Sequence, residues 1–331
     1  MEVTRARLWV AIAGIAFGAF PGCDQPSYRS LNRRVTTVIE EGKYYKALQT
    51  VEGSLAKNSR DTKLLAERVL LYLASPDRKV RSQMVVAQRE FEAAGGNRMD
   101  LLSAAGESRI PAVRKNAAYV WGALKDPSGI QLLKALAQEK DAEVRAEAVR
   151  SLARLADPSS YALFLILLRD KSWEVRAASA EALIELKRSD ALPNLLRAAN
   201  DGDRYAKAKI RDAIIVLARP SQAPLLRNQL NQGERPTKIA AALALGKLGD
   251  PAAVPFLMEI IQDPEFDGRP EAAQMVGEIG GDKVALLFEK MLPVEQDRWV
   301  ADAIVKFFSA RNDDQANRVL EEYRQRNGGG E

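Results

Sequence analysis

The chain has 331 residues, of which 47% are hydrophobic and 6% aromatic, which suits Ala- and Leu-rich helices in one long repeat array or about two domains. Its 49 Lys and Arg against 44 Asp and Glu give a net charge of +5 without a dense basic block, which argues against a dedicated nucleic-acid binder. The sequence has no His and one Cys, which removes the usual general base, the commonest metal ligand and any internal disulfide.

The N-terminus predicts export and lipid anchoring. Two arginines precede an apolar run, residues 8–20, which is too short to span a bilayer comfortably, and Gly22 and Cys23 follow it. This order resembles a bacterial lipoprotein signal, although Phe20 and Pro21 stand where Leu and a small residue are usual. The resemblance implies cleavage of residues 1–22 as a signal peptide and acylation of Cys23, palmitate included. The alternative is a chance Cys after an uncleaved anchor or an ordinary signal peptide.

The segment before the repeats differs from them in pattern. Residues 23–30 are polar and are expected to form a lipid-anchored tether, and residues 31–110 are expected to form a helical cap. Gly42 and Tyr44 belong to a helix pair that resembles the second half of a tetratricopeptide repeat. A divergent helix pair follows and ends near Ala105.

From residue 111 onward, apolar residues recur every 31 positions, which is typical of stacked helical repeats. A first helix carries one column made of Ala117, Ala148, Ser179, Ile210, Ala241, Ala272 and Ala303, and a second column made of Leu124, Leu155, Leu186, Leu217, Leu248, Ile279 and Ala310. A second helix carries Leu133, Phe164, Leu195, Leu226, Leu257, Phe288 and Val319. Asp-Pro at 126–127, 157–158 and 250–251 predicts a tight break between the helices, because Asp caps helix N-termini and Pro is tolerated at the first helical position.

This repeat resembles a HEAT repeat, of the short form found in bacterial HEAT proteins and bilin lyases. The residues that carry the resemblance are Asp141, Val144, Arg145, Ala148, Leu152, Leu155, Asp157 and Pro158. The resemblance implies an all-α, right-handed α-solenoid of about seven helix pairs over residues 111–327, with residues 328–331 as a disordered tail. The last unit departs from the pattern at Val300 and Ala310, as expected of a terminal cap.

One position of the first helix carries a cation in six units. The cations are Arg114, Arg145, Arg176, Lys207, Lys238 and Arg269. Such a row could bind phosphate or an acidic protein. However, acids lie four residues before four of the cations, a favourable spacing on a helix, and HEAT-like families use an Asp/Arg ladder between repeats. Structural pairing is therefore the favoured interpretation.

Two features outside the periodic pattern are candidates for partner binding. The second helix of a HEAT unit usually lines the concave side, where Arg169, Arg197 and Arg227 would form a basic groove for an acidic segment. Ordinary solvated surface is the alternative. Trp173 and Phe266 share a column at the start of the first helix, where aromatics serve as interface anchors or pack on the neighbouring turn.

No catalytic residue or metal site is predicted, since the sequence lacks His and its one Cys is assigned to the lipid anchor. No cofactor is predicted either, because the glycines at 246–249 and 277–281 lie in repeat turns with no preceding strand. We expect a non-enzymatic, membrane-tethered scaffold or adaptor in a bacterial cell envelope, extracytoplasmic, on the inner or outer membrane. Its partner would be an envelope protein, with no nucleic acid and no small-molecule substrate. An assembly factor or chaperone of an envelope complex, and a bilin-lyase-like enzyme, are the alternatives.

Overall fold

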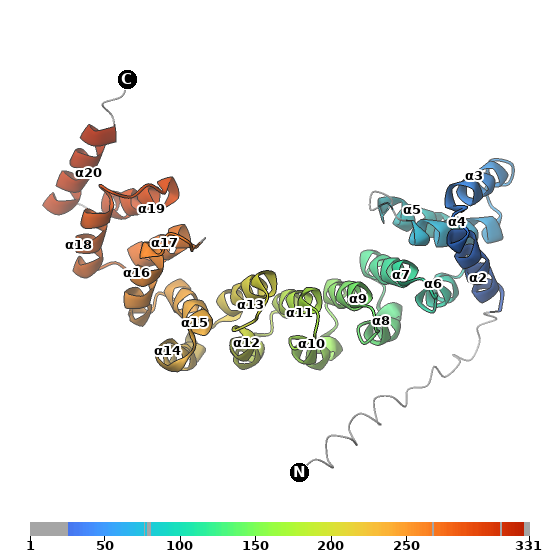
Figure 1. Ribbon diagram of the computed structural model, residues 1–331, viewed down its shortest axis with the longest axis horizontal. Helices are drawn as coiled ribbons and strands as arrows, with labels where there is room; N and C mark the ends of the chain where they lie inside the picture. Colours follow the sequence, from blue (N-terminus) through green and yellow to red (C-terminus); the bar gives the residue numbers. More distant parts are fainter. Residues whose placement is uncertain (1–25, 76, 78–80, 267, 312, 328–331) are drawn as a thin grey trace, which may run out of the picture. The chain divides into compact units, whose positions relative to one another are not determined.

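The computed structural model describes residues 26–75, 77, 81–266, 268–311 and 313–327, and within these ranges every regular element is a helix (Figure 1). The predicted signal peptide, Cys23 and residues 328–331 lie outside the described residues. The predicted fold class, an all-α solenoid of helix pairs, is confirmed. The chain divides into two compact units at Ser151 and Leu152, and each is described by itself below.

Unit 1 contains the N-terminal helices and the first repeats. Its helices are α2 (Pro26–Glu40), α3 (Tyr44–Leu55), α4 (Thr62–Ala74), α5 (Arg81–Ala93), α6 (Arg98–Gly106), α7 (Pro111–Leu124), α8 (Ile130–Leu136) and α9 (Ala142–Arg154), whose last turn passes the boundary between the units. Leu70, Phe91 and Trp121 are fully buried and form its core together with neighbouring apolar side chains.

Helix α2 begins earlier than the sequence predicted. Residues 23–30 were expected to be a tether, but α2 starts at Pro26. Proline fits the first turn of a helix because it lacks only an N–H that has no partner there. Arg29 then forms a salt bridge with Glu107, next to the end of α6, at 3.0 Å, which holds the first turn of α2 against that helix end.

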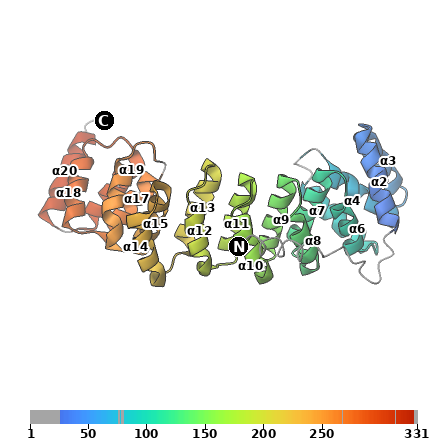
Figure 2. The same ribbon diagram turned by 60° about the horizontal axis from the view of Figure 1, so that its bottom comes forward.

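Unit 2 contains the remaining repeats. Its helices are α10 (Tyr161–Leu167), α11 (Trp173–Glu185), α12 (Leu192–Ala198), α13 (Arg204–Leu217), α14 (Ala223–Gln232), α15 (Arg235–Lys247), α16 (Val254–Gln262), α17 (Arg269–Ile279), α18 (Asp282–Met291), α19 (Arg298–Ser309) and α20 (Asp314–Asn327). Within this unit, α11, α13 and α15 follow one another along one side, and α10, α12 and α14 lie along the other (Figure 1). Figure 2 shows α11 and α13 side by side.

The predicted break between the two helices of a repeat is confirmed, with a short 3-10 turn added. Asp126, Asp157 and Asp250 each accept a hydrogen bond from the backbone N–H two residues later, at 2.9, 3.1 and 3.0 Å. The prolines that follow start the 3-10 turns Pro127–Gly129, Pro158–Ser160 and Pro251–Ala253. Repeats without Asp-Pro keep the turn, as Ser189–Ala191 and Pro220–Gln222 show.

The second-helix column is the core of the repeats, because all of its members, from Leu133 to Val319, are buried. In the first helix the small-residue column is buried from Ala117 to Ala272. The leucine column is half-buried, except that Leu217 is buried and Ala310 is exposed. The last repeat is shifted by one residue, since α19 begins at Arg298 and buries Ile304 and Phe308 completely. Ala303 is therefore only half-buried.

Candidate functional site

The four arginines of the predicted row of cations have structural partners within the repeats. Arg114 donates from Nη1 to the Ser108 carbonyl oxygen at 2.6 Å and from Nη2 to Glu139 at 2.6 Å. Arg269 donates in the same way to the Ile261 carbonyl and to Glu295, both at 2.6 Å. Each arginine thus connects the segment before its own helix to the loop before the next first helix. Guanidinium groups used in this way are not available for a ligand.

Arg145 and Arg176 occupy the same position of the repeat. Arg145 is buried and donates to the carbonyl oxygens of Glu139 and Lys140, both at 2.8 Å. Arg176 makes a two-pronged contact with Asp201, with Nη2 to Oδ1 at 2.6 Å. Burial acts to raise the pKa of Asp201, but the hydrogen bonds from Arg176 and from the Asp203 backbone outweigh it, and the pKa lies below its usual value. Structural pairing, the favoured interpretation, is confirmed for these arginines.

The three arginines of the predicted basic groove do not form a uniform row. Arg227 lies on α14 and forms a salt bridge with Asp250 at 2.7 Å, so it supports the aspartate that caps the next 3-10 turn. Arg197 lies on α12, is exposed and contacts Asn194. Arg169 is exposed in the turn that follows α10. All three arginines are exposed, and Arg227 in addition has a structural partner that the sequence did not suggest.

The two predicted aromatic positions lie differently. Trp173 is the first residue of α11 and its side chain is 38% exposed. Phe266 lies in the segment before α17, because this helix begins three residues later than the 31-residue period predicts. Its ring is half-buried, with the Arg211 guanidinium 5.5 Å from the ring centroid. Phe266 thus packs within the solenoid, and only Trp173 is placed at the helix start.

Sequence reasoning missed the partner of Trp173. Tyr205, the second residue of α13, meets Trp173 edge to face with ring centroids 5.1 Å apart, and it is 50% exposed. The Lys209 ammonium lies 5.5 Å from the Tyr205 ring centroid and pairs with Glu181 of α11 at 3.0 Å. The signal that could have found Tyr205 was its position 32 residues after Trp173, one residue off the period and hence at the same end of the next repeat.

These residues form an exposed aromatic surface on unit 2, defined here as Trp173, Tyr205 and Lys209. Edge-to-face rings are held more firmly than single exposed side chains, so the surface is preorganised. Trp and Tyr are residue types that are enriched at protein interfaces and among the residues that contribute most to binding. Nothing in this set is a nucleophile or a general base near neutral pH. Among the described residues no group of three acidic, His or Cys side chains could hold a metal ion.

A model of HEAT repeats matches residues 65–153, 131–215 and 223–307, which together make up more than half of the chain. The chain belongs to the HEAT-repeat family. The match begins at residue 65, within α4. HEAT repeats generally mediate protein–protein interactions, which indicates a protein-interaction scaffold. The tetratricopeptide-like character of the N-terminal helix pair stays a prediction.

The chain is also similar to solved structures. The Escherichia coli protein YibA is 18% identical, with a TM-score of 0.51 over 81% of this chain and 96% of that chain, and this likeness shows the fold. The complex of CpcE and CpcF of phycocyanin lyase from Nostoc sp. is 20% identical, with a TM-score of 0.40 over 68% and 93%. An engineered protein is 16% identical, with a TM-score of 0.41 over 92% and 96%. No curated protein matches this chain.

In the described part of the chain no helix is both long and apolar enough to cross a membrane.

Proposed function

We propose that this HEAT protein is a non-enzymatic adaptor, tethered to a membrane of the bacterial envelope through Cys23, that binds an envelope protein through the exposed aromatic surface. The observation that carries the binding role is the Trp173–Tyr205 pair, two aromatic rings from successive repeats that contact each other and remain 38% and 50% exposed. The tether is supported by the lipoprotein-like order of residues at the N-terminus.

The aromatic pair is expected to be an interface anchor because its exposure has no structural benefit. When a partner covers these two partly exposed rings, apolar surface is removed from water, and this favours binding. Helix N-termini of adjacent repeats place the two rings at one edge of unit 2, where a partner reaches both at once. Lys209, held over Tyr205, adds a cation at the margin of the same surface.

Site-specific photocrosslinking tests this function. A photoreactive phenylalanine in place of Tyr205, in the native cell, is expected to give a discrete adduct with one envelope protein. Trp173→Ala in the same chain is expected to reduce that adduct at least about tenfold, the effect of losing an interface anchor. The same photoreactive residue in place of Tyr45, which is 72% exposed in unit 1, is the control and should not give this adduct.

Two results would contradict the proposal. One is equal crosslinking from positions 205 and 45, which would mean that the adduct reports exposure alone. The other is a Tyr205 adduct that Trp173→Ala leaves unchanged. Thermal unfolding of the Trp173→Ala chain separates binding from folding, because the side chain is partly exposed and its loss should shift the unfolding temperature only slightly.

A further inference from the structure

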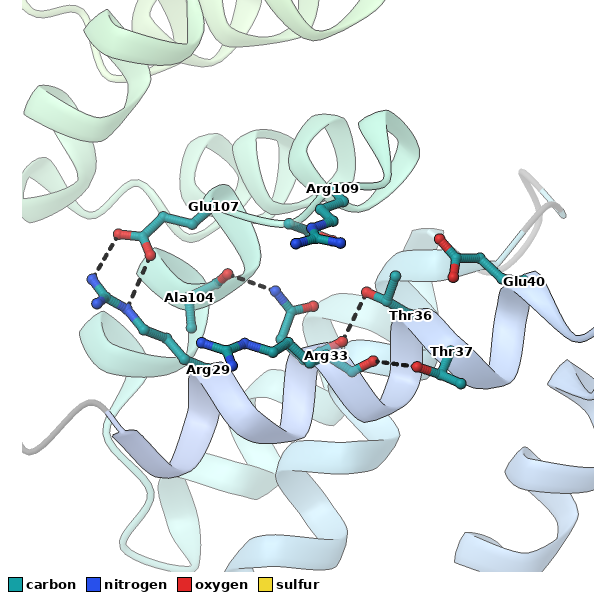
Figure 3. A pocket seen from close by; sticks show the side chains of 10 residues that line it. Arg29, Arg33, Thr36, Thr37, Glu40, Ala104, Glu107 and Arg109 are labelled. Atoms are coloured by element: carbon teal, nitrogen blue, oxygen red, sulfur yellow. Dashed lines mark hydrogen bonds and ion pairs between the residues drawn. The ribbon is translucent and has the colours of Figure 1, made fainter.

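A cavity of about 400 Å³ lies between α2 and the segment that joins α6 to α7 in unit 1. Figure 3 shows its charged lining, with Arg29, Arg33 and Glu40 on α2 and Glu107 and Arg109 on the opposite wall. Arg29 and Glu107 neutralise each other at 3.0 Å. The cavity thus has a closed ion pair at one end and further charged groups along the rest of its length.

The remaining cations in the cavity have no acidic partner. Arg33 and Arg109 are exposed, and neither guanidinium makes a hydrogen bond or ion pair with a described residue. Glu40 is the one other acid in the lining, so the cavity carries an excess of one positive charge after the Arg29–Glu107 pair is set aside. Two guanidinium groups from different elements that face one cavity provide several donors for an anion, and planar guanidinium groups suit the oxygens of phosphate esters.

A buried acceptor lies beside these donors. Asn32 is 7% exposed, and its Nδ2 donates to the Ala104 carbonyl oxygen at 2.8 Å. Its Oδ1 is buried and accepts no hydrogen bond. A buried carbonyl oxygen without a donor destabilises the free protein, so a group that donates to it would bind favourably. A fully ionised phosphate group has no donor for this oxygen, whereas a hydroxyl on a neighbouring carbon has one.

We propose that this cavity binds a phosphate ester that carries a free hydroxyl on a neighbouring carbon, of the glycerol phosphate type. Arg33 and Arg109 hold the phosphate oxygens, and the hydroxyl donates to Asn32 Oδ1. A small ester of this kind fits within 400 Å³. The acidic side chain of a protein partner would satisfy the arginines but would leave the Asn32 oxygen without a donor, so the phosphate ester uses more of the site.

Such an ester has two sources, a free metabolite and the headgroup of an anionic phospholipid. The lipid source rests on the proposed anchor at Cys23, which lies six residues before Arg29 and hence within about 20 Å along the chain. The cavity itself does not depend on the anchor. It lies in unit 1, so its test is separate from photocrosslinking at Tyr205 in unit 2.

Calorimetric titration of the full chain with glycerol 3-phosphate tests the site, with inorganic phosphate and glycerol as separate probes. We expect glycerol 3-phosphate to bind more tightly than either fragment. The double variant Arg33→Gln/Arg109→Gln should weaken binding about tenfold or more, because two charge-assisted contacts are lost. Glu40→Gln should tighten binding about two- to fivefold, because it removes a like charge from the cavity.

Arg60→Gln is the matched control. Arg60 is an exposed arginine of the same unit that lies outside this cavity, and its loss should leave binding unchanged. Flotation with vesicles of phosphatidylglycerol or phosphatidylcholine distinguishes the free ester from the lipid headgroup. Because all variants share the same N-terminus, a difference between them in flotation comes from the cavity and not from the anchor. Preference for phosphatidylglycerol that the double variant loses assigns the lipid headgroup, whereas glycerol 3-phosphate binding without such a preference assigns the free ester.

Three results would overturn the inference. The first is the absence of saturable binding by both glycerol 3-phosphate and phosphatidylglycerol vesicles. The second is binding that the double variant retains while its unfolding temperature matches that of the Arg60→Gln chain. The third is tighter binding of a glutamate-rich peptide than of glycerol 3-phosphate with loss in the double variant, which would assign the cavity to an acidic protein segment.

Discussion

Arg176 and Asp201 form two parallel contacts, Nε to Oδ2 at 2.5 Å and Nη2 to Oδ1 at 2.6 Å, across two successive repeats of unit 2. The third guanidinium nitrogen donates to the carbonyl oxygen of Asp170 at 2.9 Å. One side chain therefore joins the loop before α11 to the loop before α13. Paired contacts of this geometry are stronger and more directional than single ones.

Removal of this arginine is expected to destabilise unit 2. Arg176→Met keeps the aliphatic length but leaves the Asp201 carboxylate, whose side chain is 6% exposed, without its partner. Breaking a buried ion pair in this way costs about 3–5 kcal/mol, and the 17% exposure of Arg176 reduces the expected loss to about 2–3 kcal/mol. The midpoint of urea unfolding measures it.

Arg169→Met is the matched control, because Arg169 is an exposed arginine of the same unit. Its effect should stay within about 0.5 kcal/mol, as is usual for surface substitutions. An equal shift of the midpoint in both variants would show that the ladder contact has no structural importance.

The sequence predicted which residues form the ladder but not how they are paired. Asp203 lies four residues before Lys207 and was expected to pair with it on the helix. In the structure the Asp203 carboxylate accepts the backbone N–H groups of Tyr205 and Ala206 at 2.8 and 2.9 Å, as an N-cap. The acids that form ion pairs with Arg114 and Arg176 lie 25 residues after them, in the loop before the first helix of the next repeat. The position of that loop depends on how the repeats stack. Spacing within one helix does not contain that information.

The same distinction applies to the core and to the candidate surface. The second-helix column could be predicted completely, because a side chain such as Leu195 recurs at the same place on the apolar face of its helix in every repeat and is buried there. Tyr205 could not, since its contact with Trp173 depends on how α11 and α13 pack. Phe266 was predicted at a helix start, but α17 begins three residues later. The 31-residue period shows which positions recur but not where each helix begins.

Stability is expected to fall in acid. The hydrogen bond from Arg188 is the main cause that lowers the pKa of Asp190 to about 2, and the pKa values of Asp126 and Asp201 are also below their usual range. Because these carboxylates have lower pKa values folded than unfolded, their stabilisation is present above about pH 4 and is lost as the pH falls towards 2. The urea midpoint at a series of pH values measures this.

The absence of His from the sequence sharpens the pH prediction, since no side chain with an ordinary pKa titrates between about pH 5 and 7. The midpoint should therefore be flat over that range. Arg176→Met should show a smaller loss in acid than the unmodified chain, because Asp201 then has a more ordinary pKa. A midpoint that does not change down to about pH 2 would disprove the assignment.

Membrane association is expected to depend on Cys23. If acylation of this residue provides the anchor, Cys23→Ala should move the protein from the membrane fraction to the soluble fraction, because several acyl chains on one residue are needed for stable anchoring. Fractionation of cells by centrifugation measures the distribution. Asp24→Ala is the control and should leave the protein in the membrane fraction. Unchanged association of the Cys23→Ala chain would refute the lipoprotein interpretation and leave an uncleaved anchor as the explanation.

A position just after the first helix of each repeat allows predictions of opposite sign for the same substitution in two repeats. Ala156 has φ 51°, a left-handed conformation that costs a residue with a Cβ about 1 kcal/mol relative to glycine, and Gly249 occupies the aligned position of a later repeat with φ 73°. Ala156→Gly is therefore expected to stabilise the protein by about 0.5–1 kcal/mol. Ala218, at the aligned position, has φ −56° and is buried, so Ala218→Gly should destabilise it by at least about 0.5 kcal/mol. Urea midpoints that move in the same direction for both variants would show that the backbone conformation at position 156 is not left-handed in solution.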